Sequence, residues 1–422
     1  MSEVENGSSS EAIELAVAAD TYREFLGLSG TLWRLAVVTG IAQFTMSLWN
    51  WEFSIFLETF LEPWQMGLTF AVSTSASLIG YILSGTIADF IGRKKTMAFA
   101  FIPITIGLTT ISRYPIWPII PLEYALVQFG FSFILIMAIA IPADEIEATG
   151  GHNAARRFTM VLMPAFLVDG LSPILGATLL RVGYAPSDLH MLAAAGSIVA
   201  FVATILFVRE SLHGTIIEKA RTGPLISFRR LGTNFWRLGG GMIGFVFCFN
   251  AALPYWGNLV VGEWGIDETT FGYAWSAFSI ATVLLMHTVS GLADRNVKKA
   301  LTVAIVWNAF MILGFSFSGG LLALIVFNIV WALPVVLWIG AERTLVVADV
   351  EEQDKGRALG TYQFMMTSTN LVAAPFGAFL WTATGSLRSV WIFSGIGGLM
   401  AAVVLAVALR SMVTEKSREV DY

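Results

Sequence analysis

The stretch Gly85–Lys95 reads G-T-I-A-D-F-I-G-R-K-K, and it decides the fold of this chain. It closes an apolar run with no charged residue from Pro63 to Ala88, and then places one acid and three bases close together. Such a pattern is typical of a helix that leaves a bilayer on the cytoplasmic side, where basic residues collect. A degenerate copy at Ser290–Lys299 reads S-G-L-A-D-R-N-V-K-K, which indicates two related halves.

The composition excludes a soluble globular protein. Of the 422 residues, 56% are hydrophobic and only 13% are charged, against about 25% in soluble domains. The mean hydropathy is +0.72, and the apolar residues fall in blocks of about 20, the length that spans a bilayer. The first residues are acidic and Ser-rich, which predicts no cleaved signal peptide. The single cysteine, Cys248, allows no internal disulfide.

Hydropathy predicts twelve transmembrane helices in two sets of six. The first six are expected at about 32–57, 64–90, 96–112, 118–142, 158–180 and 189–208. The others are expected at about 238–261, 269–293, 358–384 and 390–409, with two more in 300–341 separated at Ser318–Gly320. This predicts a cytoplasmic N-terminal tail (1–30), a six-helix bundle (31–208), a cytoplasmic linker (209–237), a second bundle (238–409) and a cytoplasmic tail (410–422).

The distribution of basic residues supports this topology. Most of the 25 Lys and Arg residues fall on the side that holds both termini, and only Arg113, Arg181 and Arg388 fall on the other. Because basic loops stay in the cytoplasm, we expect both termini to be cytoplasmic. The expected location is the cell (plasma or inner) membrane, as a multi-pass protein.

The quoted stretch resembles the signature loop of the major facilitator superfamily, G-x-x-x-D-R-x-G-R-[KR]-[KR]. Gly85, Asp89, Gly92 and Arg93 match, while Phe90 replaces the usual Arg. The resemblance implies an all-α integral membrane protein with two pseudo-symmetric six-helix bundles. Solute would bind between them near the midplane, and rocking of the bundles would alternate access. We expect a monomer.

The same resemblance implies an inner gate. In the superfamily the acid of the loop faces the N-terminal end of the eleventh helix, where the helix dipole attracts it. The alternative explanation is that these residues belong to ordinary basic cytoplasmic loops and have no gating role. The residues that the resemblance assigns to this gate are Gly85, Asp89, Gly92, Arg93, Asp144, Glu145, Arg157, Asp294, Arg295, Asp349 and Arg357.

Ionisable residues inside a span are candidates for proton coupling, because a charge in a bilayer is expensive. Glu52 lies roughly 27 Å beyond Arg34, and Asp169 about 18 Å beyond Arg157, at the helical rise per residue. His287 is the third candidate. Each has a plainer explanation: Glu52 faces an outer aqueous vestibule, Asp169 bonds to a neighbouring helix, and His287 is a structural donor.

Glu52 also resembles the first-helix acid of sugar and organic-acid symporters in the superfamily. Arg209-Glu210-Ser211 resembles the P-E-S-P-R stretch of sugar porters. These two features place the chain near the sugar porter or metabolite:proton symporter branch. The segment Gly170–Gly176 faintly resembles an antiporter motif instead.

Amides and aromatic residues at membrane depth are the candidates for solute binding. Amides hydrogen-bond a solute or a neighbouring helix, and aromatic faces stack on rings or cradle cations. An interfacial aromatic belt is the alternative for the aromatics. The candidates are Asn50, Trp51, Gln128, Asn250, Tyr255, Trp256, Trp331, Trp338, Gln363 and Asn370.

The sequence contains no Walker loop, no His/Cys metal cluster and no G-x-S-x-G elbow. We therefore expect no enzyme activity, no cofactor, no metal and no nucleic-acid partner. No Lys or Arg is predicted in the core of a span, which favours a neutral or cationic solute. The predicted function is proton-coupled symport of a small polar solute, sugar-like or a related metabolite, with protons or another ion as the coupling partner. The alternatives are a proton/drug antiporter and a membrane solute sensor that does not transport.

Overall fold

The computed structural model describes residues 28–148, 154–211, 231–348, 350 and 355–412, without the side chains of 143, 144, 146–148, 154–159, 287–295 and 355–357. The regular elements described are helical, as a bilayer requires, because hydrocarbon offers no partner to an unpaired backbone group. The first half contains α2 (Gly30–Ser47), α3 (Phe53–Glu58), α4 (Pro63–Ile91), α5 (Arg93–Arg113), α6 (Ile120–Ala148), α7 (Ala154–Arg181) and α8 (Pro186–Phe207).

The second half begins with α10 (Thr233–Ala252), inside the range assigned to the linker. The same span continues through the short helices η1 (Leu253–Tyr255), α11 (Trp256–Asn258) and η2 (Leu259–Glu263). The rest of this half contains α12 (Glu268–Arg295), α13 (Val297–Phe317), α14 (Leu321–Val347), α15 (Lys355–Ser368), α16 (Asn370–Thr384) and α17 (Leu387–Arg410).

Ten described helices are long and apolar enough to cross a membrane. The other two predicted spans are broken helices, and none of their separate pieces is both long and apolar enough to cross a membrane alone. The first span breaks between α2 and α3 at Leu48–Glu52, and the eleventh breaks between α15 and α16 at Thr369. The predicted break at Ser318–Gly320 is confirmed, and Gly320 there adopts a φ of 84°, which favours glycine.

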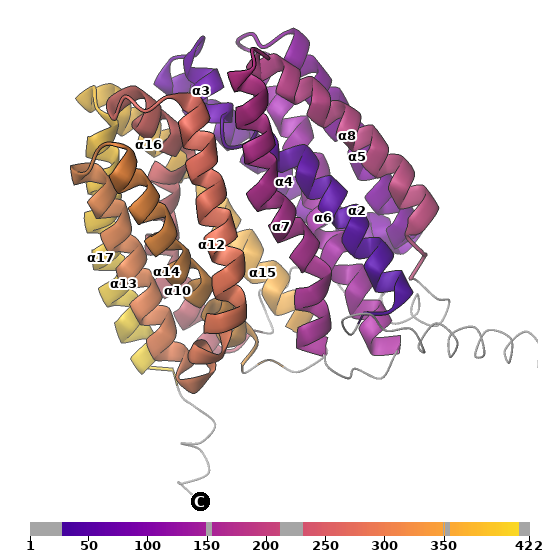
Figure 1. Ribbon diagram of the computed structural model, residues 1–422. Helices are drawn as coiled ribbons and strands as arrows, with labels where there is room; N and C mark the ends of the chain where they lie inside the picture. Colours follow the sequence, from indigo (N-terminus) through magenta and orange to yellow (C-terminus); the bar gives the residue numbers. More distant parts are fainter. Residues whose placement is uncertain (1–27, 149–153, 212–230, 349, 351–354, 413–422) are drawn as a thin grey trace, which may run out of the picture.

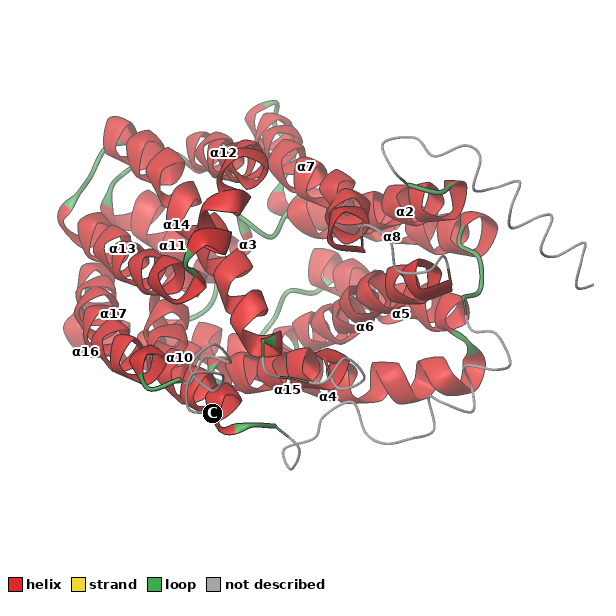
Figure 2. Cartoon of the chain, turned by 90° about the horizontal axis from the view of Figure 1, so that it is seen from below, coloured by secondary structure: helices red, strands yellow, loops and turns green. Residues whose placement is uncertain are grey.

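The two halves stand side by side (Figure 1), with the indigo-to-magenta helices in one bundle and the orange-to-yellow helices in the other. Across the boundary α7 packs on α12, and α4 packs on α16 and α15. The view from below shows α12 beside α7 and α15 beside α4 (Figure 2). This arrangement, with the described helices in two bundles, is the predicted major facilitator fold.

The halves are fastened together towards one end, which we call the outer end because the basic-residue rule predicts that it faces outside. Asn258 Nδ2 donates to the backbone oxygen of Ser54 at 2.8 Å and to Glu58 Oε2 at 2.6 Å. The hydroxyls of Thr178 and Tyr273 lie 3.2 Å apart. These contacts join the two halves at the outer end.

Close helix packing in the second half depends on Gly377. A Cβ atom at this position in α16 would lie 1.9 Å from the backbone oxygen of Ala251 in α10. Small residues allow such close approach, which is how helices associate in lipid without a hydrophobic driving force.

We expect Gly377→Ala to destabilise the folded protein by about 1–3 kcal/mol, because the backbone of α10 must move to admit the methyl group. The measurement is the midpoint of thermal unfolding in detergent. Gly340→Ala is the matched control, since a Cβ at Gly340 meets nothing within 4 Å. Equal midpoints for the two variants would contradict this account of the packing.

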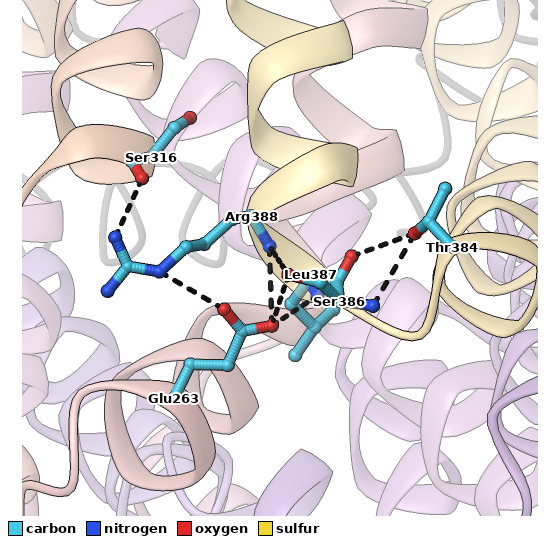
Figure 3. Close-up of polar contacts among 6 residues, drawn as sticks. All are labelled: Glu263, Ser316, Thr384, Ser386, Leu387 and Arg388. Atoms are coloured by element: carbon cyan, nitrogen blue, oxygen red, sulfur yellow. Dashed lines mark hydrogen bonds and ion pairs between the residues drawn. The ribbon is translucent and has the colours of Figure 1, made fainter.

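Glu263 ties the end of the seventh span to the start of α17 (Figure 3). Its Oε1 accepts hydrogen bonds from Ser386 Oγ at 3.0 Å, from the Leu387 amide and from the Arg388 amide at 3.4 Å. Its Oε2 lies 3.3 Å from Arg388 Nε, and Arg388 Nη1 donates to the backbone oxygen of Ser316 at 3.0 Å. The carboxylate thereby caps the N-terminus of α17, where the helix dipole favours negative charge.

Glu263→Ala should lower the free energy of unfolding by about 1 kcal/mol, the usual loss of an N-terminal cap. Arg388→Ala should cost less, because the ion pair is partly exposed and such pairs contribute about 0–1 kcal/mol. Thermal unfolding midpoints of the two variants compare these contributions. A larger loss in Arg388→Ala would show that the ion pair, not the cap, stabilises this corner.

Candidate functional site

A cavity of about 440 Å³ lies between the two halves. The first half contributes the break after α2, together with α3, α4 and α6, and the second contributes the seventh span, α12, α15 and α16. The lining residues are Asn50, Trp51, Phe53, Ser54, Phe70, Ser73, Thr74, Ser77, Tyr81, Tyr124, Gln128, Asn250, Leu253, Pro254, Trp256, Gly257, Trp275, Gln363, Thr367, Asn370 and Ala374. A cavity shared by both halves is where an alternating-access protein binds its solute.

Helix α4 gives the cavity a polar face. Ser73, Ser77 and Tyr81 recur every four residues, so they lie on one side of the helix. Ser77 Oγ reaches the backbone oxygens of Ser73 at 3.2 Å and of Gln128 at 3.4 Å. Sequence reasoning missed these residues, although polar residues at this spacing within an apolar run are the signal that would have found them.

The facing wall on α6 carries a phenol and an amide. Tyr124 and Gln128 are one helical turn apart, and Gln128 Nε2 donates to the Tyr124 hydroxyl at 2.6 Å. The phenol hydrogen and the amide oxygen of this pair are left for other partners. The pair therefore offers both a donor and an acceptor to a solute.

The eleventh span, which packs against α4, supplies another wall of the cavity. Gln363, Thr367, Asn370 and Ala374 follow each other at helical spacing on α15 and α16. Gln363 Nε2 donates to Thr367 Oγ1 at 3.2 Å. Because the helix breaks at Thr369, the amide of Asn370 lies beside the break.

Two polar atoms among the lining residues have no hydrogen-bond partner within the described part of the chain: Trp256 Nε1 and Asn370 Oδ1. A buried donor or acceptor without a partner is costly, so such atoms are suited to bind a solute. Asn50 and Gln363 also line the cavity, and both residues are exposed.

None of the residues that line this described cavity is Asp, Glu, Lys, Arg or His. Its polar groups are amides, hydroxyls and an indole, and they alternate with aromatic rings. Such a surface offers hydrogen bonds and flat apolar faces without a compensating charge. An ionised solute would lose its hydration here with no opposite charge to replace it.

The structure brings together most of the predicted solute-binding residues. Those that line the cavity are Asn50, Trp51, Gln128, Asn250, Trp256, Gln363 and Asn370. Three others lie outside its lining. The Tyr255 hydroxyl donates to the backbone oxygen of Ala374 at 2.8 Å, Trp331 Nε1 donates to Asn308 Oδ1 at 2.7 Å, and Trp338 packs edge-on against two phenylalanine rings.

Glu52 lies at the break between α2 and α3, not within a continuous helix. It is 0% exposed, and it is absent from the cavity lining. The alternative that Glu52 faces an outer aqueous vestibule therefore does not describe this closed arrangement. The neighbouring Trp51 does reach the cavity.

Asp169 lies where α2, α7 and α12 meet. Its Oδ1 accepts from Ser47 Oγ at 2.5 Å and from Gln43 Nε2 at 3.1 Å, and its Oδ2 accepts from Ser279 Oγ at 3.2 Å. The bond from Ser279 crosses between the halves. Asp169 is half-buried and lies outside the cavity lining.

The signature loop is anchored within the first half. Gly92 adopts a φ of 96°, and the next amide, that of Arg93, donates to Glu210 Oε1 at 2.9 Å. Arg93 Nη1 donates to the backbone oxygen of Ala140 at 2.5 Å, close to the inner end of α6. The loop thus docks on the Arg209–Ser211 stretch that sequence analysis singled out, while Asp89 is exposed.

Of the other predicted gate residues, Gly85 is buried in α4, and Glu145 Oε1 accepts from Ser29 Oγ at 3.2 Å. The remaining ones lie outside the described residues or side chains: Asp144, Arg157, Asp294, Arg295, Asp349 and Arg357. The side chain of His287 is also among those that the structure does not describe.

Comparison with known proteins agrees with this architecture. The family model of the Major Facilitator Superfamily matches residues 240–421. The enterobactin exporter EntS of Shigella flexneri is 22% identical over 354 residues, which cover 82% of this chain and 80% of the exporter. EntS of Escherichia coli O1:K1 is 23% identical over 361 residues, with 82% and 80% covered.

Solved structures share the fold at low identity. The nucleoside transporter NupG superposes with a TM-score of 0.71 at 14% identity, covering 91% of this chain and 100% of NupG. A bacterial homologue of the human lysosomal transporter Spinster superposes with a TM-score of 0.72 at 14% identity, covering 90% and 96%. The predicted similarity to the sugar porter branch is not confirmed, since both relatives named here are enterobactin exporters. The family match and the shared fold together support a multi-pass membrane transporter of the major facilitator superfamily.

Proposed function

We propose that this chain is a secondary transporter that exports an uncharged, hydrogen-bonding organic solute in exchange for protons. The observation that carries the proposal is the cavity lining, which combines amides, hydroxyls and aromatic rings with no ionisable acid or base. Neutral polar groups suit hydroxyl, carbonyl and amide groups of a solute, and the rings suit its flat faces. Export is favoured because the curated relatives over four fifths of the chain are named as exporters.

Symport of a sugar-like solute is the second candidate. The same amides and hydroxyls would bind the hydroxyl groups of a sugar ring, and Glu52 occupies the place of the first-helix acid of such symporters. A non-transporting sensor is the third, and it predicts binding without flux. Flux and its direction relative to protons separate the three.

The first test uses proteoliposomes with a pH-sensitive dye inside and a panel of external solutes. We expect uncharged compounds such as sugars, nucleosides or enterobactin to give a signal, and carboxylates and hydrophobic cations to give none, because the cavity offers no opposite charge. Internal alkalinisation supports exchange, whereas internal acidification supports symport. A signal from carboxylates or cations alone would contradict the assignment of a neutral solute.

Substitutions in the cavity lining test whether the solute-driven pH signal depends on this cavity. Gln128→Ala and Asn370→Ala should each raise KM about 2- to 10-fold, the loss of one neutral hydrogen bond. Gln65→Ala is the matched control, since this amide accepts from the Glu62 backbone at the outer end of α4. An unchanged KM in both cavity variants would place solute binding elsewhere.

Asp169 is the proposed coupling residue. Three donors surround its carboxylate, and the one from Ser279 belongs to the opposite half. We expect separation of the halves to break the Ser279 bond, which links the surroundings of Asp169 to the change between the two states. Glu52 and His287 remain the other predicted sites.

We expect Asp169→Asn to abolish solute-driven proton movement while exchange of labelled solute across the liposome membrane continues, because exchange needs no net proton transfer. Ser279→Ala keeps the carboxylate and should keep the proton signal. The dye assay and a labelled-solute exchange assay are run on the same proteoliposomes. A normal proton signal in Asp169→Asn would move the coupling role to another residue.

A further inference from the structure

The broken first span is pressed against the second half at the outer end. The Trp51 ring lies so close to Gly272 of α12 that a Cβ there would be 2.9 Å from it, and its centroid is 6.3 Å from that of Phe271. One turn further on, a Cβ at Gly257 would lie 2.9 Å from the Ile55 side chain. The break between α2 and α3 therefore belongs to the contacts that join the two halves at the outer end, which we call the outer closure.

Glu52 lies in this contact, fully buried, and neither of its carboxyl oxygens has a donor within the described residues. The polar group within hydrogen-bonding reach is the carboxyl of Glu268, in the first turn of α12 in the opposite half. Glu268 Oε1 is likewise buried without a donor. Two ionised carboxylates only accept hydrogen bonds, so a bond between them requires a proton on one.

We propose that Glu52 and Glu268 form a proton-binding site between the two halves, and that the bound proton holds the outer end closed. With the proton present, one carboxyl donates to the other across the boundary. Without it, two negative charges face each other, one of them on the fully buried Glu52, and the halves separate to hydrate them. The site senses the pH of the outer side whichever solute the cavity takes.

Other charged groups near the contact have their own partners or lie apart from the pair. Asp267 adds a negative charge beside Glu268, and hydrogen bonds from Thr269 and Thr270 hold the pKa of Asp267 below its usual value. Glu58 accepts from Asn258, and Glu263 is held by Arg388. The ring of His190 on α8 packs against Trp49, Phe53 and Phe56. Towards the same end, the packed helices also carry Glu62, Glu123 and Asp188, and the Asp188 carboxylate accepts from the Ala185 amide. Asp169 lies deeper on α7, where it bonds to Ser279, and Arg181 ends α7.

The geometry also indicates which carboxyl holds the proton. Glu268 lies in the first turn of α12, where the helix dipole favours a negative charge. Glu52 is completely buried and caps no helix with its side chain. The proton therefore resides on Glu52, and Glu268 accepts the hydrogen bond.

The test measures the separation of the outer ends as a function of pH. Spin labels are placed at Val182→Cys, after α7, and at Leu322→Cys, in the first turn of α14. Both side chains are exposed (69% and 77%) at the outer end. Cys248→Ser removes the native thiol. Distances are recorded by pulsed electron spin resonance in lipid nanodiscs over a series of buffers from acidic to alkaline pH.

In the otherwise wild-type chain, the short-distance population should dominate at low pH and decline as the pH rises. Glu52→Gln should keep the short distance at every pH, because the amide donates to Glu268 without titrating. Glu268→Gln should also flatten the pH dependence, since it removes the like charge. Glu62→Gln is the matched control, an exposed acid at the same end of the molecule, and should behave as wild type.

A wild-type distance distribution that does not change with pH overturns the proposal. So does a pH dependence that survives in both Glu52→Gln and Glu268→Gln. The measurement contains no solute, so its outcome is independent of the transport assays that test the proposed function.

Discussion

The cost of burying an uncompensated charge in a low-dielectric environment is the constraint on which this structure depends. It confines most Lys and Arg residues to the ends of helices and leaves the cavity lined by neutral groups. The ionisable side chains that do lie within the spans have defined surroundings. Asp169 accepts from Ser47, Gln43 and Ser279, and Glu342 accepts from the Tyr362 hydroxyl at 2.6 Å. Among the described residues, the carboxyl of Glu268 is the polar partner of Glu52.

The same environment explains how the halves are joined. Lipid does not drive apolar helices together, so association relies on close packing and hydrogen bonds. Glycines allow that approach at Gly272 and Gly257, and Asn258 adds hydrogen bonds across the boundary. These contacts gather at the outer end. A boundary fastened at one end by short-range contacts is able to open there and close at the other end.

The cavity and the closure share one structural device, the broken helix. The break after α2 turns Asn50 and Trp51 towards the cavity and buries Glu52 against α12. The break at Thr369 places Asn370 beside the cavity, and the irregular seventh span does the same for Trp256. Irregular backbone is tolerated at membrane depth where protein or a cavity surrounds it. Movement at these breaks would therefore change the cavity and the closure together.

The sequence by itself determined the number and order of the spans, the break at Ser318–Gly320 and the division into halves, because hydropathy and charge act locally along the chain. It also identified the amides Gln128, Gln363 and Asn370 as polar groups in apolar runs. Only the tertiary structure decided which polar groups meet: that Trp331 bonds to Asn308 instead of lining the cavity, and that Glu52 faces Glu268. Those pairings join residues far apart in the sequence, through helix rotation and packing that no local pattern records.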